Sequence, residues 1–391
     1  MGEGEEALPD YPIVEPAYIT DARPSDNLDS MAVHGKWVYV TAKGRRTRGG
    51  DIIRNGAVQQ YDLTTGEFVK EMPGFKSDRW DTVQRPNGIA VVGNIAYVVD
   101  RENVSVTVAS FAPSSGGEGE TWKILANFGW DRLIFPYGVA AVAMDKEQRF
   151  HRLFVTDSHP TESHARVLAF SVRFLHAAIG NEVVTRVLEA FGDSRGPGVI
   201  HKAESLAVSP DLRYMLIADE HKDHRDIKVY DWDNKFMQRT ITGFHGEPEG
   251  IATFKLSKQN WFWVCADQTD DPVTNSFRVY DGQTLRHHKT FRIAGVSVTD
   301  GICISQAPVG RRFPEGVMVA ADRDQSIAVV DLRNIRALLA DSTTVATTVV
   351  SDHVCTRCGK PADMRCSRCR TPYCGRDCQS RDWPLHITKC L

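Results

Sequence analysis

The sequence lacks any long apolar run. No stretch approaches the ~18 apolar residues of a membrane-spanning helix, so we expect no contact with a membrane. The first six residues are acidic, and no apolar segment follows them, so we expect no secretory leader. An excess of charge of one sign is missing as well, because 47 Lys and Arg stand against 50 Asp and Glu. This balance argues against nucleic acid as a partner.

Two catalytic motifs are also absent, and cysteine is scarce over most of the chain. There is no Walker-type phosphate loop and no G-x-S-x-G nucleophile turn. Before residue 355 the cysteines are Cys265 and Cys303, both in apolar strand-like runs, whereas the other seven of the nine lie between Cys355 and Cys390. Such a cluster without a leader indicates metal binding in a reducing compartment, the cytoplasm or the nucleus.

The cysteine-rich tail has the spacing of metal ligands, C-x2-C-x7-C-x2-C-x4-C-x3-C-x7-H-x3-C. The eight candidate ligands are Cys355, Cys358, Cys366, Cys369, Cys374, Cys378, His386 and Cys390. Eight such ligands make two closed tetrahedral Zn²⁺ sites. A segment this short cannot fold on an apolar core alone, so zinc must supply the folding free energy. The spacing itself permits either interleaved or sequential pairing of the ligands.

The tail resembles the MYND zinc fingers over its whole length. Beyond the ligands, Gln379 after Cys378 and the Asp382-Trp383 pair before His386 match the signature of that family. The resemblance implies an interleaved pairing and a groove for a short proline-containing peptide, lined by Gln379 and Trp383. The alternative role for Trp383 is packing over the zinc core. The implied zinc sites are Cys355, Cys358, Cys374 and Cys378 for one ion, and Cys366, Cys369, His386 and Cys390 for the other.

Residues 26–335 contain a repeated unit. Each unit begins with a polar or aromatic residue, then a small residue and a short apolar strand; a second apolar strand follows. The six opening residues, at spacings of 58, 50, 67, 45 and 51, are Asp29, Asn87, Tyr137, Glu204, Glu249 and Asp300. Five of the second strands end near an aspartate: Asp100, Asp157, Asp219, Asp267 and Asp322. Three or four short strands per ~50 residues, repeated six times, predict a six-bladed β-propeller.

The chain is therefore predicted to be mostly β and to have four parts. These are an N-terminal extension (1–25), a six-bladed β-propeller (26–340), a linker (341–353) and a two-zinc finger (355–391). The extension holds four prolines and no clear period, so it is either partly disordered or supplies a closing strand. Asn334–Ala340 is expected to be a short helical turn, and Val345–Val350 is either a closing strand or plain linker.

The residue that opens each inner strand of a propeller faces the mouth of the central channel. Oxygen ligands in one ring form a candidate site for a hard cation such as Ca²⁺. The members that offer a carboxylate or amide oxygen are Asp29, Asn87, Glu204, Glu249 and Asp300, and Tyr137 is the sixth residue. The alternative is a hydrated acidic channel without a ligand.

Short segments of the propeller region resemble the β-propeller phytases. They are Ala42-Lys43, Asp100-Arg101, Pro136-Tyr137-Gly138, Ala203-Glu204, Pro248-Glu249-Gly250 and Thr299-Asp300-Gly301-Ile302. The resemblance implies calcium ligands at Glu204, Glu249 and Asp300. It also implies phosphate contacts, and hence catalytic roles, for Lys43, Arg101 and Tyr137. Non-enzymatic NHL-repeat propellers share related segments, and Pro86–Val91 resembles them.

Two functions follow from these features. The favoured one is an intracellular adaptor in which the finger captures a proline-containing peptide and the propeller serves as a platform. The alternative is a calcium-dependent phosphoesterase of phytase type with the finger as an interaction module. The chain is therefore not assigned as an enzyme from its sequence.

Overall fold

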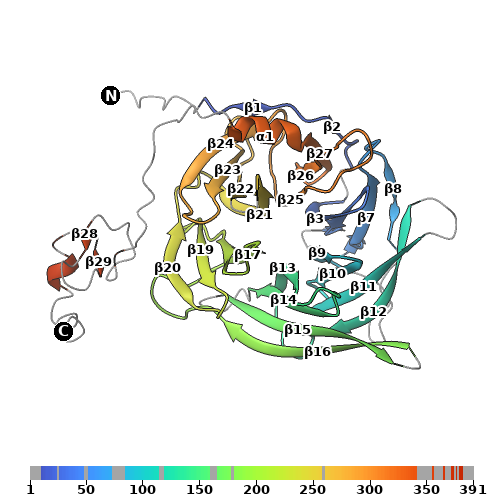
Figure 1. Cartoon of the computed structure of the whole chain (residues 1–391), viewed down its shortest axis with the longest axis horizontal. Coiled ribbons are helices and arrows are strands. Elements are labelled where there is room, and N and C mark those ends of the chain that lie inside the picture. The colour runs from blue at the N-terminus through green and yellow to red at the C-terminus, as the bar shows by residue number, and fades with distance from the viewer. Residues whose placement is uncertain are drawn as a thin grey trace.

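The computed structural model of this chain shows a protein built mainly of strands. It describes residues 10–23, 26–47, 52–72, 84–113, 119–158, 165–177, 180–257, 260–340, 355, 364–365, 371–373, 376 and 378–381. Six sheets of four or five strands surround one axis (Figure 1). The predicted six-bladed propeller is confirmed. Among the residues just given, no helix is long and apolar enough to cross a membrane.

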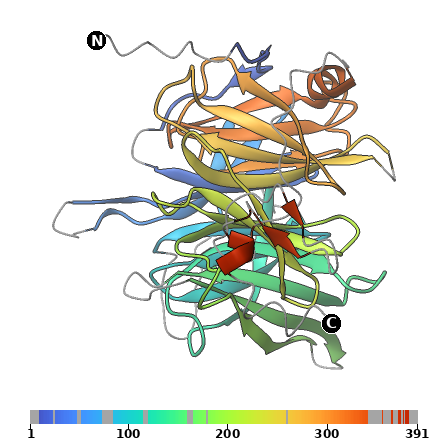
Figure 2. The same cartoon turned by 90° about the vertical axis from the view of Figure 1, so that its left-hand side faces the viewer.

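The first three blades are four-stranded antiparallel sheets whose first strand lies nearest the axis. A small hairpin of β5 (Arg45–Arg46) and β6 (Ile52–Arg54) interrupts the first blade and is the blue hairpin that projects from the propeller in Figure 2. From the axis outward, the strands are β3 (Leu28–His34), β4 (Trp37–Ala42), β7 (Ala57–Asp62) and β8 (Phe68–Glu71) in blade one; β9 (Pro86–Val92), β10 (Ile95–Asp100), β11 (Ser105–Pro113) and β12 (Glu120–Phe128) in blade two; and β13 (Pro136–Ala143), β14 (Phe150–Asp157), β15 (Arg166–Ala177) and β16 (Gly180–Phe191) in blade three.

The other three blades continue this pattern, and the last two receive strands from the N-terminal segment. Their strands are β17 (Ala203–Val208), β18 (Tyr214–Asp219), β19 (Asp226–Asp231) and β20 (Phe236–Ile241) in blade four; β21 (Glu247–Lys255), β22 (Trp261–Gln268), β23 (Ser276–Asp281), β24 (His287–Ile293) and β1 (Ile13–Val14) in blade five; and β25 (Ile302–Ser305), β26 (Val317–Asp322), β27 (Ser326–Asp331) and β2 (Tyr18–Ile19) in blade six.

Strand β2 closes the propeller. It runs antiparallel to β27, with Tyr18 opposite Val329 and Ile19 opposite Ala328. The backbone of Ala17 adds an N–H···O bond of 2.7 Å to Val329. Blade six therefore combines the beginning and the end of the propeller sequence, and the N-terminal segment supplies the closing strand. The other candidate for that role, Val345–Val350, lies outside the described residues.

The hydrophobic core is divided into six layers, one between each pair of neighbouring blades. Strand β4 shows how the sequence builds them. Val38 and Val40 pack into the layer between blades one and six, whereas Tyr39 packs into the layer between blades one and two. Successive side chains of a strand point to opposite faces, so a strand buried on both faces reads as an apolar run.

The recurrent aspartates of the second strands hold the backbone that leads into the inner strands. Asp157 accepts backbone hydrogen bonds from Ile134 at 3.0 Å and Phe135 at 2.5 Å, just before β13 begins. The same contact to the corresponding loop is made by Asp100, Asp219, Asp267 and Asp322. Each aspartate thus fixes a segment two to four residues before a ring residue, which explains why this residue type recurs with the repeat.

The inner strands approach one another closely around the axis. A Cβ atom at Gly138 would lie 2.5 Å from the carbonyl oxygen of Glu204, in the next blade. Thr156 strengthens the same junction, because its Oγ1 donates to that carbonyl oxygen at 2.8 Å. Thr41 bridges blades one and two in the same way, donating to Asn87 O at 2.6 Å. Small residues are therefore needed here, and the side chains that precede them converge on one mouth of the channel.

The helix α1 (Leu332–Ala340) directly follows β27, the third strand of blade six, and packs on blades five and six. Its buried residues Leu332, Ile335 and Leu339 are three or four apart and so lie on one face. Lys289 Nζ donates to the carbonyl oxygen of Leu338 at 2.7 Å. A cation there satisfies an orphan carbonyl and complements the negative end of the helix dipole.

Candidate functional site

The candidate site is a cavity of about 680 Å³ at one mouth of the channel. Four of the predicted ring residues line it directly: Tyr137, Glu204, Glu249 and Asp300. Lys43 and Arg101 also line it. The remaining two ring residues, Asp29 and Asn87, are buried beside it and join it through hydrogen bonds described below. The structure thus brings together side chains from all six blades, as the repeat predicts.

One half of the ring is an internal ion-pair network centred on Lys43. Its Nζ lies 3.1 Å from Asp29 Oδ2 and 2.8 Å from Asp300 Oδ2. Asn87 Nδ2 donates to Asp29 Oδ2 at 3.1 Å, and Gln268 Nε2 donates to Asp300 Oδ1. Burial opposes the charge on Lys43, but Asp29 and Asp300 raise the pKa of its ammonium well above the ordinary value. This half is therefore held together by its own cation.

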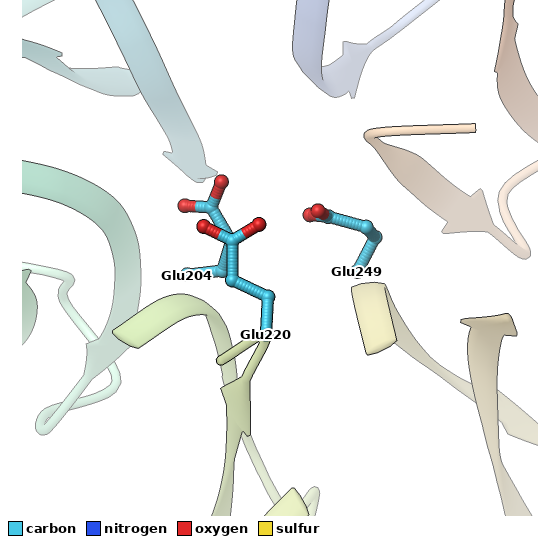
Figure 3. A group of neighbouring side chains, drawn as sticks. All are labelled: Glu204, Glu220 and Glu249. Carbon is cyan, nitrogen blue, oxygen red and sulfur yellow. The ribbon is translucent and has the colours of Figure 1, made fainter. Parts of the chain in front are cut away.

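The other half is acidic. Carboxylate oxygens of Glu204, Glu220 and Glu249 all lie within 4.8 Å of one another, and Figure 3 shows the three side chains converging. All three residues are buried, and Glu204 Oε2 has no hydrogen-bond partner among the described residues. Lys202 Nζ pairs with Glu220 Oε1 at 2.5 Å. The triad thus retains more negative than positive charge.

Burial and mutual repulsion act on these carboxyls. The pKa of Glu204 is raised well above its ordinary value by burial and then by the charge of Glu220. The pKa of Glu249 is raised in the same direction by burial, then by Glu204 and Glu220. Carboxyls in this situation take up protons unless a cation compensates them. At Glu204 and Glu249, protonation would therefore compete with any cation that bound there.

Arg101 and Tyr137 form the wall beside the triad. The Arg101 guanidinium lies 3.7 Å from the centre of the Phe135 ring and 5.1 Å from that of Tyr137. Within the described part of the chain it makes no ion pair. Burial lowers its pKa, and the carboxylates of Glu204 and Asp29 act in the opposite direction. Burial raises the pKa of Glu204, and the neighbouring Tyr137 side chain acts on that pKa in the opposite direction. A cationic group is thus presented to the cavity by an aromatic surface.

Glu220 was missing from the ring predicted from the sequence. It does not open an inner strand but follows β18, where its backbone N–H donates to Lys202 O at 3.1 Å. The sequence held a signal, because Glu220 directly follows Asp219, one of the recurrent aspartates. Asp219 accepts backbone hydrogen bonds from His201 and Lys202, and this turns the next residue toward the channel.

The tail shows the local elements of a small zinc-binding fold. Strands β28 (Met364–Arg365) and β29 (Pro372–Tyr373) pair as an antiparallel hairpin, and a short helical segment covers residues 378–381. Cys355 is fully buried, and Cys378 is half-buried at the start of the helical segment. Gln379 is half-buried beside it. The other predicted ligands and groove residue lie outside the described residues: Cys358, Cys366, Cys369, Cys374, His386, Cys390 and Trp383.

Comparison with known proteins identifies this tail. Residues 355–390 match the MYND finger family. The tail is a MYND finger. This chain is 45% identical over 42 residues to the zinc finger MYND domain-containing protein 10 homolog of Drosophila melanogaster, and the match covers 10% of this chain and 9% of that protein. It is 46% identical over 37 residues to dauer abnormal formation protein 25 of Caenorhabditis elegans, 9% of this chain and 10% of that protein.

The matches with these two curated relatives cover 10% and 9% of this chain, and the chain spans about a tenth of each relative. Membership of the family implies that the tail binds zinc, in agreement with the cysteine and histidine donors. The functions of the longer relatives do not follow from so short a match.

Solved structures resemble the propeller. Chaetomium thermophilum Sqt1 bound to the N-terminus of the ribosomal protein L10 is 12% identical, with 82% of this chain and 88% of that chain covered and a TM-score of 0.49. The Neurospora crassa Pan2 WD40 domain is 10% identical, with 79% and 76% covered and a TM-score of 0.46. Similarity at this level carries no argument about the ligand or partner of this chain.

Proposed function

We propose that the protein is an adaptor in which the MYND finger captures a short proline-containing peptide and the propeller serves as a platform. The observation that carries this proposal is the match of residues 355–390 to the MYND family. Gln379 supports it, because it lies half-buried in the same helical segment as Cys378. An amide and the ring of Trp383 suit such a peptide, since the ring packs on the pyrrolidine and the amide bonds the backbone.

The finger is proposed to hold two zinc ions in an interleaved arrangement. One ion would be bound by Cys355, Cys358, Cys374 and Cys378, and the other by Cys366, Cys369, His386 and Cys390. Interleaved sites join the two ends of the segment, so that zinc replaces the missing apolar core. The reduced thiols that such sites need place the protein in the cytoplasm or the nucleus.

Peptide binding by the full chain tests the adaptor function. An array of proline-containing peptides, each paired with its Pro→Ala counterpart, is probed with wild-type protein and the Trp383→Ala, Gln379→Ala and Ser380→Ala variants. We expect proline-dependent binding that is lost with Trp383→Ala and weakened with Gln379→Ala, while the zinc content is unchanged. Ser380 is the matched control because it is exposed on the same helical segment. Equal binding of the peptides and their Pro→Ala counterparts contradicts the proposal, and so does binding that is retained by the Trp383→Ala variant.

A second candidate function is a Ca²⁺ site at the channel mouth. It is favoured by the buried Glu204 Oε2, which has no hydrogen-bond partner in the part of the chain that the structure describes. Calcium is bound by oxygen at about 2.3–2.6 Å, so two of its ligand atoms lie at most about 5 Å apart. The 4.8 Å limit on the distances within the triad meets this condition. Lys202 compensates one of the three carboxylates, and the remaining two match a divalent ion. Tyr137 and Asp300 would complete the surroundings.

A phosphoesterase activity of phytase type would need an anion held beside this cation. Arg101 is the side chain placed for that role, since its guanidinium lines the cavity without an ion pair among the described residues. Tyr137 lies on the same wall, whereas the ammonium of Lys43 already contacts Asp29 and Asp300. If the activity exists, Arg101→Ala abolishes calcium-dependent release of phosphate from inositol phosphates, and Arg132→Ala, a change at an exposed position, preserves it.

A further inference from the structure

The starting point is the environment of Lys43. This residue follows β4, and its side chain is only 9% exposed. A buried ammonium is costly unless negative groups surround it. Asp29 and Asp300 meet this need from two different blades, at 3.1 and 2.8 Å. Lys43 therefore occupies the space between two ring carboxylates that a free cation would otherwise take.

The two halves of the ring differ in how their oxygens are satisfied. Besides Lys43, Asp29 accepts hydrogen bonds from Asn87 Nδ2 at 3.1 Å and Ser30 Oγ at 3.1 Å. Asp300 accepts one from Gln268 Nε2. In the acidic half, by contrast, Glu204 Oε2 has no partner among the described residues. Both carboxylates of the first half, Asp29 and Asp300, are therefore satisfied without a ligand, whereas the Glu204 carboxylate of the second half is not.

We propose that Lys43 acts as a tethered cation that fills the Asp29–Asp300 half of the ring and limits the channel mouth to a single metal ion at Glu204, Glu220 and Glu249. This inference rests on the proposed cation site. An ammonium fixed to the chain cannot dissociate, so calcium cannot displace it by mass action as it would a free ion. Lys43 is thus a residue that determines how many ions the site takes.

Removal of Lys43 would leave a second set of oxygen ligands. Asp29 and Asp300 would lose their counter-charge. Asn87, whose Nδ2 donates a hydrogen bond to Asp29, also carries a buried Oδ1 that has no hydrogen-bond partner among the described residues. Asp324 is a further carboxyl beside this half, since its pKa is raised by burial and then by the charge of Asp300, while Lys43 acts in the opposite direction. Carboxylate and amide oxygens are the ligands that calcium prefers.

The test counts calcium ions in the zinc-loaded full chain. Wild-type, Lys43→Met, Lys43→Arg and Lys36→Met proteins are equilibrated with millimolar Ca²⁺, freed of unbound ions, and analysed by elemental mass spectrometry. We expect one calcium in wild type, two in Lys43→Met, and one in Lys43→Arg, which keeps the tethered charge. Lys36→Met is the matched control and should hold one, because Lys36 pairs with Asp62 at the surface.

The outcomes separate the two proposals. One calcium in both wild type and Lys43→Met overturns the tethered cation but leaves the cation site in place. No calcium in either protein overturns both. No calcium in wild type with one in Lys43→Met supports the role of Lys43 and refutes the triad site. Should Lys43→Met fail to fold in the absence of calcium, recovery of its circular dichroism on adding Ca²⁺ supports the inference, and no recovery overturns it.

Discussion

Lys43 and Asp300 are 257 residues apart in the sequence, yet the Nζ of one lies 2.8 Å from the carboxylate of the other. Lys43 follows the second strand of blade one, and Asp300 precedes the inner strand of blade six. Their ion pair therefore spans the junction at which the propeller closes. Both residues line the candidate site, so closure of the ring and assembly of the site are one event.

The zinc ligands can be tested by a single substitution. Cys366→Ala would leave one of the two proposed sites with three ligands, and such a site is no longer closed. We expect elemental analysis to show fewer than two zinc ions per chain and proteolysis to cleave the finger. The control is Cys303→Ala, which removes a thiol of strand β25 outside the finger. Two tightly held zinc ions in Cys366→Ala would contradict the ligand assignment.

Calcium should raise the melting temperature of the propeller. An ion that binds only the native state stabilises it by about 3 kcal/mol when its free concentration is a hundredfold above Kd. Glu249→Gln removes one of the three carboxylates and should reduce the shift. Glu182→Gln is the control, because Glu182 is exposed on β16. A melting temperature that does not respond to millimolar Ca²⁺ would leave the ring as a hydrated channel lining.

The propeller should fold without the finger, because its closing strand comes from the N-terminal segment. A chain ending at Asp341 keeps all six sheets, so we expect it to stay soluble and rich in strand after chelation of zinc.

Deletion of residues 1–21 should destabilise the propeller more than removal of the finger does. It removes β2 together with the hydrogen bond from Tyr18 Oη to Leu63 O at 2.6 Å, and we expect a loss of about 2–4 kcal/mol. Thermal unfolding followed by circular dichroism measures both.

Stability in the absence of calcium should fall as the pH rises toward neutrality. The pKa of Asp324 is raised from 3.8 to about 7 by burial and then by the charge of Asp300. The folded state therefore binds the proton more tightly than the unfolded state does. The contribution of this proton to the free energy of unfolding is fully present below the unfolded-state pKa of Asp324. It is lost as the pH rises through about 7. The raised pKa values of Glu204 and Glu249 act in the same direction.

The Asp324→Asn variant separates the contribution of Asp324 to the pH dependence of stability from the contributions of Glu204 and Glu249. An amide cannot ionise, so the variant should be more stable than wild type at pH 7.5 by about 1–2 kcal/mol, after discounting for solvent screening. Its stability should also vary less between pH 4 and pH 7. Asp270→Asn is the matched control, since Asp270 is exposed. Denaturant unfolding across this pH range measures the free energy of unfolding of each protein. If that free energy varies with pH in the same way for Asp324→Asn and wild type, the prediction is wrong.

The blades could be predicted from the sequence because each repeat carries its own local pattern. Asn87-Gly88 and Glu249-Gly250 mark inner strands through their small residues, and the structure shows that those glycines face the backbone of the next blade. The finger could be predicted because ligand spacing is a property of the local sequence. In both cases the information lies within a few tens of residues.

The contacts within the site could not be predicted in the same way. That Lys43 pairs with Asp29 and Asp300 depends on how blades one and six meet, and no local pattern encodes this geometry. Glu220 reaches the ring from a loop and not from an inner strand. Strand β2 has two residues, too few to show a period, so its pairing with β27 follows from the closed ring alone.

The closing strand also constrains synthesis on the ribosome. Thr20 Oγ1 accepts a hydrogen bond from the backbone of Ile327, 307 residues further along the chain. At about 5–20 residues per second, translation takes about 15–60 s to cover that distance. During that interval the segment around Tyr18 has emerged but its partner strand does not yet exist. Nascent chains consequently carry an unmatched strand until the last blade is made, and this interval is when the protein is most exposed to chaperones and to pairing with other chains.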